Sequence, residues 1–125
     1  MKKPKKPKKP TKSKLTNRLD VLWSHIIKKV GKCERCGRTY NLQAAHIHSR
    51  SNRSTRWILL NGLCLCGGCH LFWAHQHPTD FTDFVMNKLG FDVYDELRTL
   101  AHTAKHYTVD NMLEIESQLK QVANG

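Results

Sequence analysis

The chain lacks long hydrophobic runs and is poor in acidic residues. None of its apolar stretches approaches the roughly 20 residues that cross a bilayer, and no hydrophobic segment follows the lysines at the N-terminus. The sequence therefore predicts neither a membrane partner nor a secretory signal. Ten acidic residues stand against 21 lysines and arginines, which gives a formal net charge of +11 over 125 residues. A chain of this length forms one domain at most, and its basic balance favours a polyanionic partner.

Proline is scarce outside the first ten residues, where three of the four prolines each follow a pair of lysines. Such triplets cannot form a helix, because proline lacks an amide donor and the like charges repel each other. We therefore expect residues 1–14 to form a disordered, extended basic arm. The arm suits nonspecific phosphate binding, and a purely solubilising or targeting extension is the alternative. Its candidate nucleic-acid contacts are Lys5, Lys6, Lys8 and Lys9.

Cysteine is also sparse, but four of the five cysteines follow a metal-binding pattern. They form two Cys-x-x-Cys pairs, Cys33 with Cys36 and Cys66 with Cys69. Two such pairs can present four thiolates to one tetrahedral zinc ion, which would be structural. This use of cysteine, and the odd total, favour a reducing intracellular setting over a disulfide framework. Cys64 is left over and is expected to be a small apolar filler.

The hydrophobic pattern predicts an α+β protein. Apolar residues at helical spacing predict a helix over residues 17–30, with Asn17 as its cap. Strands are expected at residues 40–48 and 56–60, joined by the polar loop 49–55. A short helix is expected at 70–76, ended by Pro78. Further helices are expected at residues 80–89, 92–103 and 109–122.

Three residues with chemical potential accompany the cysteine pairs. His46 lies between the pairs, Asn61 precedes the second pair, and His70 directly follows its last cysteine. Imidazole has an ordinary pKa of about 6.5, so it is largely neutral at physiological pH and ready to accept a proton. His102 and His106 stand apart in the last third of the chain, and we expect them to be ordinary histidines.

The order of these residues resembles the HNH endonuclease family. The resemblance rests on Cys33-x-x-Cys36, then Ala45-His46-Ile47, then Asn61 to Cys69-His70, and it covers about a third of the chain. It is similar in particular to small phage nucleases. It implies a zinc-clipped ββα-metal core at residues 15–78, which includes the leading helix, and a C-terminal helical extension at residues 79–125. It also implies DNA as partner and a phage or bacterial protein in the cytoplasm of a bacterial cell.

The resemblance further implies a role for each residue. His46 would be the general base that activates water, and Asn61 would hold the loop that carries it. His70 would bind a catalytic divalent ion, Mg²⁺ or Mn²⁺ by preference. Histidine ligands also accept Ni²⁺ or Zn²⁺, so the identity of the ion stays open.

The chain departs from the commonest family pattern directly before the base. Many members carry an aspartate or a second histidine there as a metal ligand, and this chain has Ala45. Water and substrate phosphate could fill the vacant position, and so could another histidine. His48 would share a strand face with His46, and His75 would be offset from His70 by about a third of a helical turn. His77 is a weaker candidate.

Three arginines, Arg50, Arg53 and Arg56, lie in or beside the polar loop and are candidate phosphate contacts. A binding function alone would also explain the cysteines and the charge. The alternative to a nuclease is therefore a zinc-knuckle module that binds nucleic acid without cutting it. The C-terminal helices are expected either to close the core or to pair with a second copy of the chain.

Overall fold

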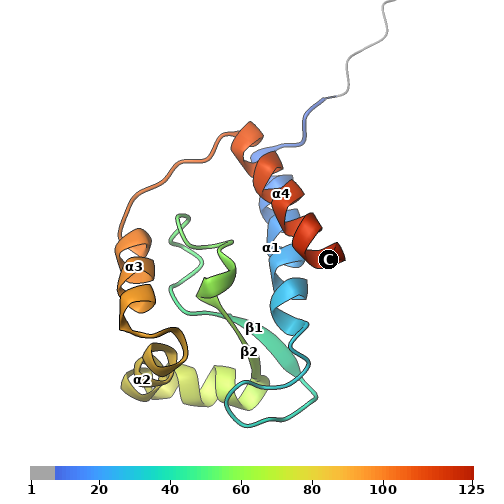
Figure 1. Ribbon diagram of the computed structural model, residues 1–125. Coiled ribbons are helices and arrows are strands. Elements are labelled where there is room, and N and C mark those ends of the chain that lie inside the picture. The colour runs from blue at the N-terminus through green and yellow to red at the C-terminus, as the bar shows by residue number, and fades with distance from the viewer. Residues whose placement is uncertain (1–7) are drawn as a thin grey trace, which may run out of the picture.

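The computed structural model describes residues 8–125, which form the α+β protein that the sequence predicts (Figure 1). Two strands and several helices make up the fold, and no helix in residues 8–125 is both long and apolar enough to cross a bilayer. The elements in chain order are α1 (Lys12–Lys28), β1 (Leu42–His46), the 3₁₀ turn η1 (Leu59–Asn61), β2 (Gly62–Cys66), the π-helix η2 (Cys69–Ala74), α2 (Pro78–Leu89), α3 (Phe91–Ala101) and α4 (Val109–Asn124).

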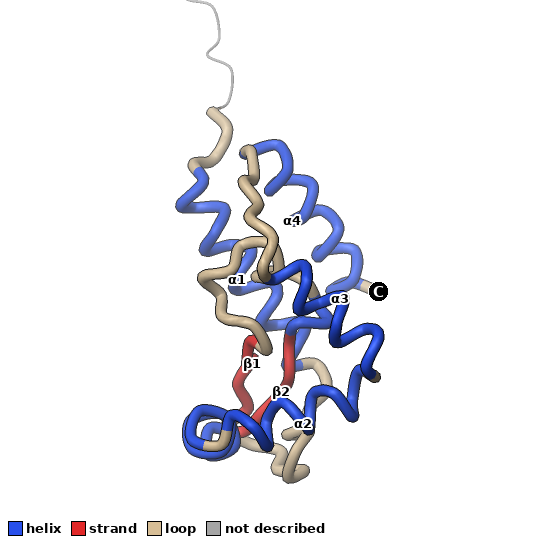
Figure 2. The backbone as a smooth tube through the Cα atoms, turned by 90° about the vertical axis from the view of Figure 1, so that its left-hand side faces the viewer, coloured by secondary structure: helices blue, strands red, loops and turns tan. Residues whose placement is uncertain are grey.

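Strands β1 and β2 form an antiparallel hairpin, in which Ala44 pairs with Cys64 and His46 with Gly62. Helices lie on both of its sides: the α1–α4 pair on one, η2 and α2 on the other (Figures 1 and 2). Side chains on a strand alternate between the two faces, and the hairpin follows this rule. Cys64 packs toward α1 and α4, whereas Leu63 and Leu65 pack toward α2. The strands therefore separate two hydrophobic cores.

The first core explains the sequence of α1. Leu15, Leu19, Trp23 and Ile27 recur every four residues and are all buried against α4 and the hairpin. Met112 and Leu119 of α4 complete this core. Two side-chain contacts fix the α1–α4 pair further: Arg18 binds the buried Glu116 through both carboxylate oxygens, and Lys29 donates to the carbonyl of Ala123.

Helix α1 passes the first residue of β2 so closely that only glycine fits at position 62. A Cβ atom there would lie 2.4 Å from Cδ1 of Ile27 and 2.7 Å from the Trp23 ring. Such distances are well below normal van der Waals contact. Gly62 therefore sets how near α1 comes to the hairpin, at the position that pairs with His46.

The start of α1 differs from the sequence-based expectation. The helix begins at Lys12, where the side chain of Thr11 accepts a hydrogen bond from the amide of Lys14. Residues 12–14 therefore belong to a helix and not to the extended arm. The reason is local: the last proline of the arm is Pro10, and threonine is a good N-cap, so the cap lies at Thr11 and not at Asn17.

The second strand also lies elsewhere than expected. Residues 56–60 form turns and part of η1, and the partner of β1 is Gly62–Cys66. The strand thus includes Cys66, the first residue of the second cysteine pair. The sequence pattern had assigned this pair to a metal-binding turn alone. All five of its residues are buried, because helices cover both faces of the hairpin.

Pro78 starts a helix instead of only ending one. It occupies the first position of α2, where its missing amide hydrogen costs nothing. Asp80, the expected cap, lies in the first turn of this helix. The ends of the two last helices agree with expectation to within two residues.

Truncating a side chain of the first core should destabilise the protein. Leu19 is fully buried, so Leu19→Ala should lower the free energy of unfolding by about 2–5 kcal/mol, through lost transfer energy and a residual cavity. Val21 on the same helix is 71% exposed, and Val21→Ala should have little effect. Denaturant unfolding followed by circular dichroism measures both changes. Equal effects of the two substitutions would contradict the described packing of α1.

Candidate metal centre and histidine cleft

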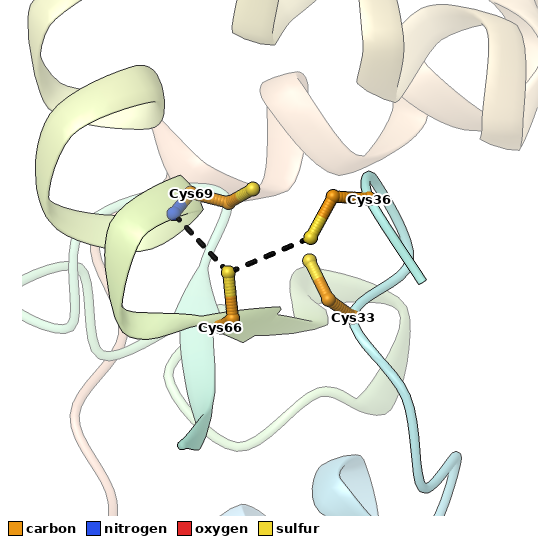
Figure 3. A group of neighbouring side chains, drawn as sticks. All are labelled: Cys33, Cys36, Cys66 and Cys69. Atoms are coloured by element: carbon orange, nitrogen blue, oxygen red, sulfur yellow. Dashed lines mark hydrogen bonds between the residues drawn. The ribbon is translucent and has the colours of Figure 1, made fainter. Parts of the chain in front are cut away.

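The four cysteines of the two pairs meet at one point (Figure 3). Cys33 and Cys36 come from the loop after α1, Cys66 from the end of β2, and Cys69 from the start of η2. Their sulfur atoms all lie within 4.8 Å of one another, and Sγ of Cys36 is 3.7 Å from Sγ of Cys66. Zinc–sulfur bonds of about 2.3 Å give a tetrahedron with sulfur–sulfur edges of about 3.8 Å. The spacing therefore fits one zinc ion, and the predicted gathering of these residues is confirmed.

The surroundings of the sulfur atoms suit negative charge. The amide of Cys69 donates to Sγ of Cys66, and the Arg35 guanidinium donates to Sγ of Cys69, each at 3.5 Å. Burial disfavours the thiolate of Cys33, but nearby backbone amides outweigh it and lower its pKa to about 6. Burial raises the pKa of Cys69 to about 12, so in the metal-free protein this group is a thiol. A bound cation would compensate for that burial.

His46, at the end of β1, is held on two sides. Its ring stacks on the indole of Trp23 from α1, with centroids 4.0 Å apart and planes 11° from parallel. Its Nε2 lies 3.0 Å from the carbonyl oxygen of Arg56. A carbonyl only accepts, so Nε2 carries the hydrogen and Nδ1 keeps its lone pair. Burial lowers the pKa of His46 below 6.5, although the hydrogen bond to Arg56 partly opposes this.

Asn61 fixes the loop that follows His46. Its side chain is fully buried and bonds both backbone groups of His48: Oδ1 accepts from the amide at 2.9 Å, and Nδ2 donates to the carbonyl at 3.1 Å. The amide of Ile47 donates to the carbonyl of Asn61 at 2.8 Å. One asparagine thus holds the two residues after His46 in place.

His70 lies in η2, directly after the metal cluster. Its Nδ1 is 2.8 Å from Oε1 of Gln43 on β1, and its ring centroid is 5.3 Å from that of His75. The amide oxygen accepts, so Nδ1 carries the hydrogen and Nε2 is free. Burial and the nearby His75 lower the pKa of His70. The sequence had predicted an α-helix here, but the observed π-helix is wider and brings the two rings together.

The structure brings four of the predicted site residues, three histidines and Arg50, to one cleft of about 770 Å³ between α1, β1 and η2. His46 contributes from β1, and His70 and His75 contribute from the helical segment. Arg50 and Ala45 also line it. The cleft therefore combines a neutral imidazole, two further imidazoles and a guanidinium.

His48 is not part of this cleft. Strand β1 ends at His46, so the alternation that would have placed His48 beside it does not continue. Its ring lies near Tyr94 of α3, and its Nε2 is buried without a hydrogen-bond partner within residues 8–125. Burial lowers its pKa, with smaller contributions from His102 and Arg98. His77 lies apart as well, in a hollow with Arg35 and Trp73.

The three candidate arginines have different surroundings. Arg56 binds Asp20 of α1 with two nitrogens, at 3.0 and 2.6 Å, and its third nitrogen donates to the carbonyl of Arg50. Its guanidinium is thus committed within the protein. Arg50 and Arg53 are exposed, and only Arg50 lines the cleft.

Of the candidate lysines in the arm, Lys5 and Lys6 lie outside the described residues. Lys8 is exposed, and Lys9 pairs with Asp110 of α4 at 2.6 Å. Both partners of that pair are largely exposed, so it contributes little stability and yields readily to a competing phosphate.

Three residues around the cleft could not be identified from the sequence. Trp23 is one of the apolar residues that predict the first helix, and it lies in the core as their spacing indicates, but its ring also stacks on His46. Asp20 orients Arg56, whose carbonyl holds His46, and Gln43 holds His70. The sequence placed these three residues on a predicted helix or strand. It contained no pattern that linked α1 to the histidines of the cleft.

Comparisons of the chain with models of protein families, with curated proteins and with solved structures found no match.

Removal of one sulfur ligand should unfold the region around the cluster. Cys36 is the exposed member, so Cys36→Ser alters packing least while it removes a ligand. We expect loss of about one equivalent of zinc and a clear fall in the melting temperature, because structural zinc contributes directly to folding. Zinc content by elemental analysis and thermal unfolding measure these effects.

The matched control is Cys64→Ala, which removes a buried thiol outside the cluster. This variant should lose some packing energy but retain its zinc. Equal zinc loss in both variants would show that the four-cysteine assignment is wrong.

Proposed function

We propose that this protein is a metal-dependent DNA endonuclease of the HNH type. The observation that carries the proposal is the cleft itself, which His46 enters from a strand and His70 from a helix anchored by the cysteine cluster. On this proposal the hairpin with η2 is the ββα-metal core. The residues around the cleft can supply a general base, a metal ligand and phosphate contacts, the groups that phosphodiester hydrolysis needs.

His46 suits the role of general base. Its Nε2–H is donated to Arg56, so the free lone pair on Nδ1 is the proton acceptor. The lowered pKa keeps the ring neutral at physiological pH. Stacking on Trp23 and the loop held by Asn61 limit rotation of the ring, so that the acceptor keeps one direction.

His70 suits the role of metal ligand. Gln43 holds its Nδ1–H, which orients the Nε2 lone pair away from β1. A divalent ion bound there would stabilise the negative charge that develops on the phosphate and on the leaving oxygen. Water attacks phosphorus as His46 takes its proton, the bond from phosphorus to the 3′ oxygen breaks, and that oxygen takes a proton from solvent water. The products are a 5′-phosphate and a 3′-hydroxyl.

Basic residues in the cleft and beside it support DNA as the substrate. Arg50 lines the cleft, and Arg53 lies three residues further along the chain. Both side chains are exposed, so we propose them as the phosphate contacts. The arm adds a concentrated positive charge at the N-terminus of α1. Arm contacts of this kind increase affinity without selecting a sequence, and they weaken as salt rises.

One observation favours the alternative of a binding module that does not cut. Ala45 lines the cleft at the position where the related family pattern has a metal ligand, and its methyl group binds no ion. A cleavage assay separates the two functions.

Substitution of His46 or of His70 should abolish cleavage without loss of structure. We expect wild-type protein with Mg²⁺, Mn²⁺ or Ni²⁺ to cleave supercoiled plasmid, and His46→Ala to cleave about 10²–10⁴-fold more slowly, the usual contribution of a general base. His70→Ala should also lose activity. The control is His106→Ala, an exposed histidine between α3 and α4, which should cleave like wild type. Plasmid binding without cleavage under all three ions would favour the binding module.

The pH dependence should follow His46. Its pKa in the folded protein lies below 6.5, and the base works only when neutral, so activity should be complete above that pKa and fall as pH drops through it. We therefore expect the acid limb of kcat/KM for cleavage to lie below pH 6.5. Initial rates between about pH 5 and pH 8 locate it. An acid limb above pH 6.5 would contradict the assignment of His46 as the base.

A further inference from the structure

We propose that His70 and His75 together bind the divalent ion, so that His75 supplies the ligand that Ala45 cannot, and that the ion is a transition metal. This inference rests on the proposed function, because it concerns the ion of the same cleft. It adds the second protein ligand and the chemical class of the ion, which the general proposal leaves open.

The π-helical geometry of η2 is the first observation. Five residues along a regular α-helix end more than a third of a turn away from the starting direction. In a π-helix the hydrogen bonds run from residue i to residue i+5, so each turn is wider and residue i+5 lies near residue i. Segment Cys69–Ala74 is π-helical; His70 lies within it, His75 directly follows it, and both residues line the cleft. The unusual helix thus places on one face two side chains that an α-helix would separate.

The separation of the rings fits two ligands on one ion. A metal–nitrogen bond of about 2.1 Å in the plane of the ring puts the ion roughly 3.2 Å from an imidazole centroid. For ligand angles from octahedral to tetrahedral, two such centroids lie about 4.6–5.3 Å apart. The observed distance between the His70 and His75 centroids is 5.3 Å.

The hydrogen bonds leave the required lone pairs free. His70 donates Nδ1–H to Gln43, which leaves Nε2 as its ligand atom, and a held ring of this kind is typical of metal-binding histidines. His75 is exposed, and no side-chain hydrogen bond engages it within the described part of the chain. Its ring is therefore free to turn toward the ion.

The donor set selects the class of ion. Asp20 is the one carboxylate that lines the cleft among residues 8–125, and its oxygens accept from Arg56 and from the Trp57 indole. Mg²⁺ prefers oxygen ligands in octahedral geometry, whereas two imidazoles favour Ni²⁺, Zn²⁺ or a similar ion. Two protein ligands leave positions open for water and for a phosphate oxygen of the substrate.

The test is a titration of zinc-loaded protein with Ni²⁺ by isothermal calorimetry, with elemental analysis to confirm that the cysteine-bound zinc is retained. Wild type should bind about one Ni²⁺. His75→Ala and His70→Ala should each weaken binding by at least about tenfold, since each removes a ligand. The matched control is His77→Ala, which removes a nearby histidine that faces a different hollow. It should bind Ni²⁺ like wild type, and all the proteins should bind Mg²⁺ far more weakly.

The outcomes separate this inference from the proposed function. If His70→Ala weakens Ni²⁺ binding and His75→Ala does not, the second ligand is wrong while the nuclease proposal stands. Mg²⁺ binding as tight as that of Ni²⁺ would also overturn the inference. If Ni²⁺ binding depends on both histidines but no ion supports plasmid cleavage, the two-histidine site is confirmed and the nuclease proposal fails.

Discussion

The convergence of four sulfur atoms is the constraint on which the rest of the structure depends. Three separate segments meet there: the loop after α1, the end of β2 and the first residue of η2. A two-stranded hairpin alone is barely stable in water, and three of the four cluster cysteines are buried, where a thiolate is costly without a bound cation. A tetrahedral ion bound by the four sulfur atoms would tie these segments together and fix where the π-helix starts. The position of His70, the next residue, follows from that anchor.

The other half of the cleft depends on α1 and not on the cysteine cluster. Trp23 covers the His46 ring, and Asp20 from the same helix fixes Arg56, whose carbonyl holds Nε2 of that ring. Helix α4 in turn holds α1 through Met112, Leu119 and Glu116. The terminal helices are thus not a remote extension, because they support one wall of the cleft. The cysteine cluster supports the opposite wall.

Much of this arrangement could be read from the sequence, but only where the signal was local. The Cys33–Cys36 and Cys66–Cys69 spacings predicted the cluster, and apolar periodicity predicted α4 almost to its ends. Strand β2 was missed because its residues are buried on both faces, which removes the alternation that marks a strand. The π-helix was missed because no residue pattern distinguishes it from an α-helix. The contacts from Trp23 and Gln43 to the histidines are long-range, and such pairings arise only from tertiary packing.

Gly62 has a consequence for sequence change in this protein. It is the residue opposite His46 in the hairpin, and it touches the side of α1 that carries Trp23 and Ile27. Even a single methyl group there would press on the side chains of Ile27 and Trp23, and these side chains or the helix that carries them would have to shift outward. The cysteine cluster would stay in place under such a shift. The ring of His46 would lose its stacking contact with Trp23. Gly62 carries no charge and takes no part in the chemistry. Its small size nevertheless sets the distance between α1 and the hairpin, and therefore the width of the cleft.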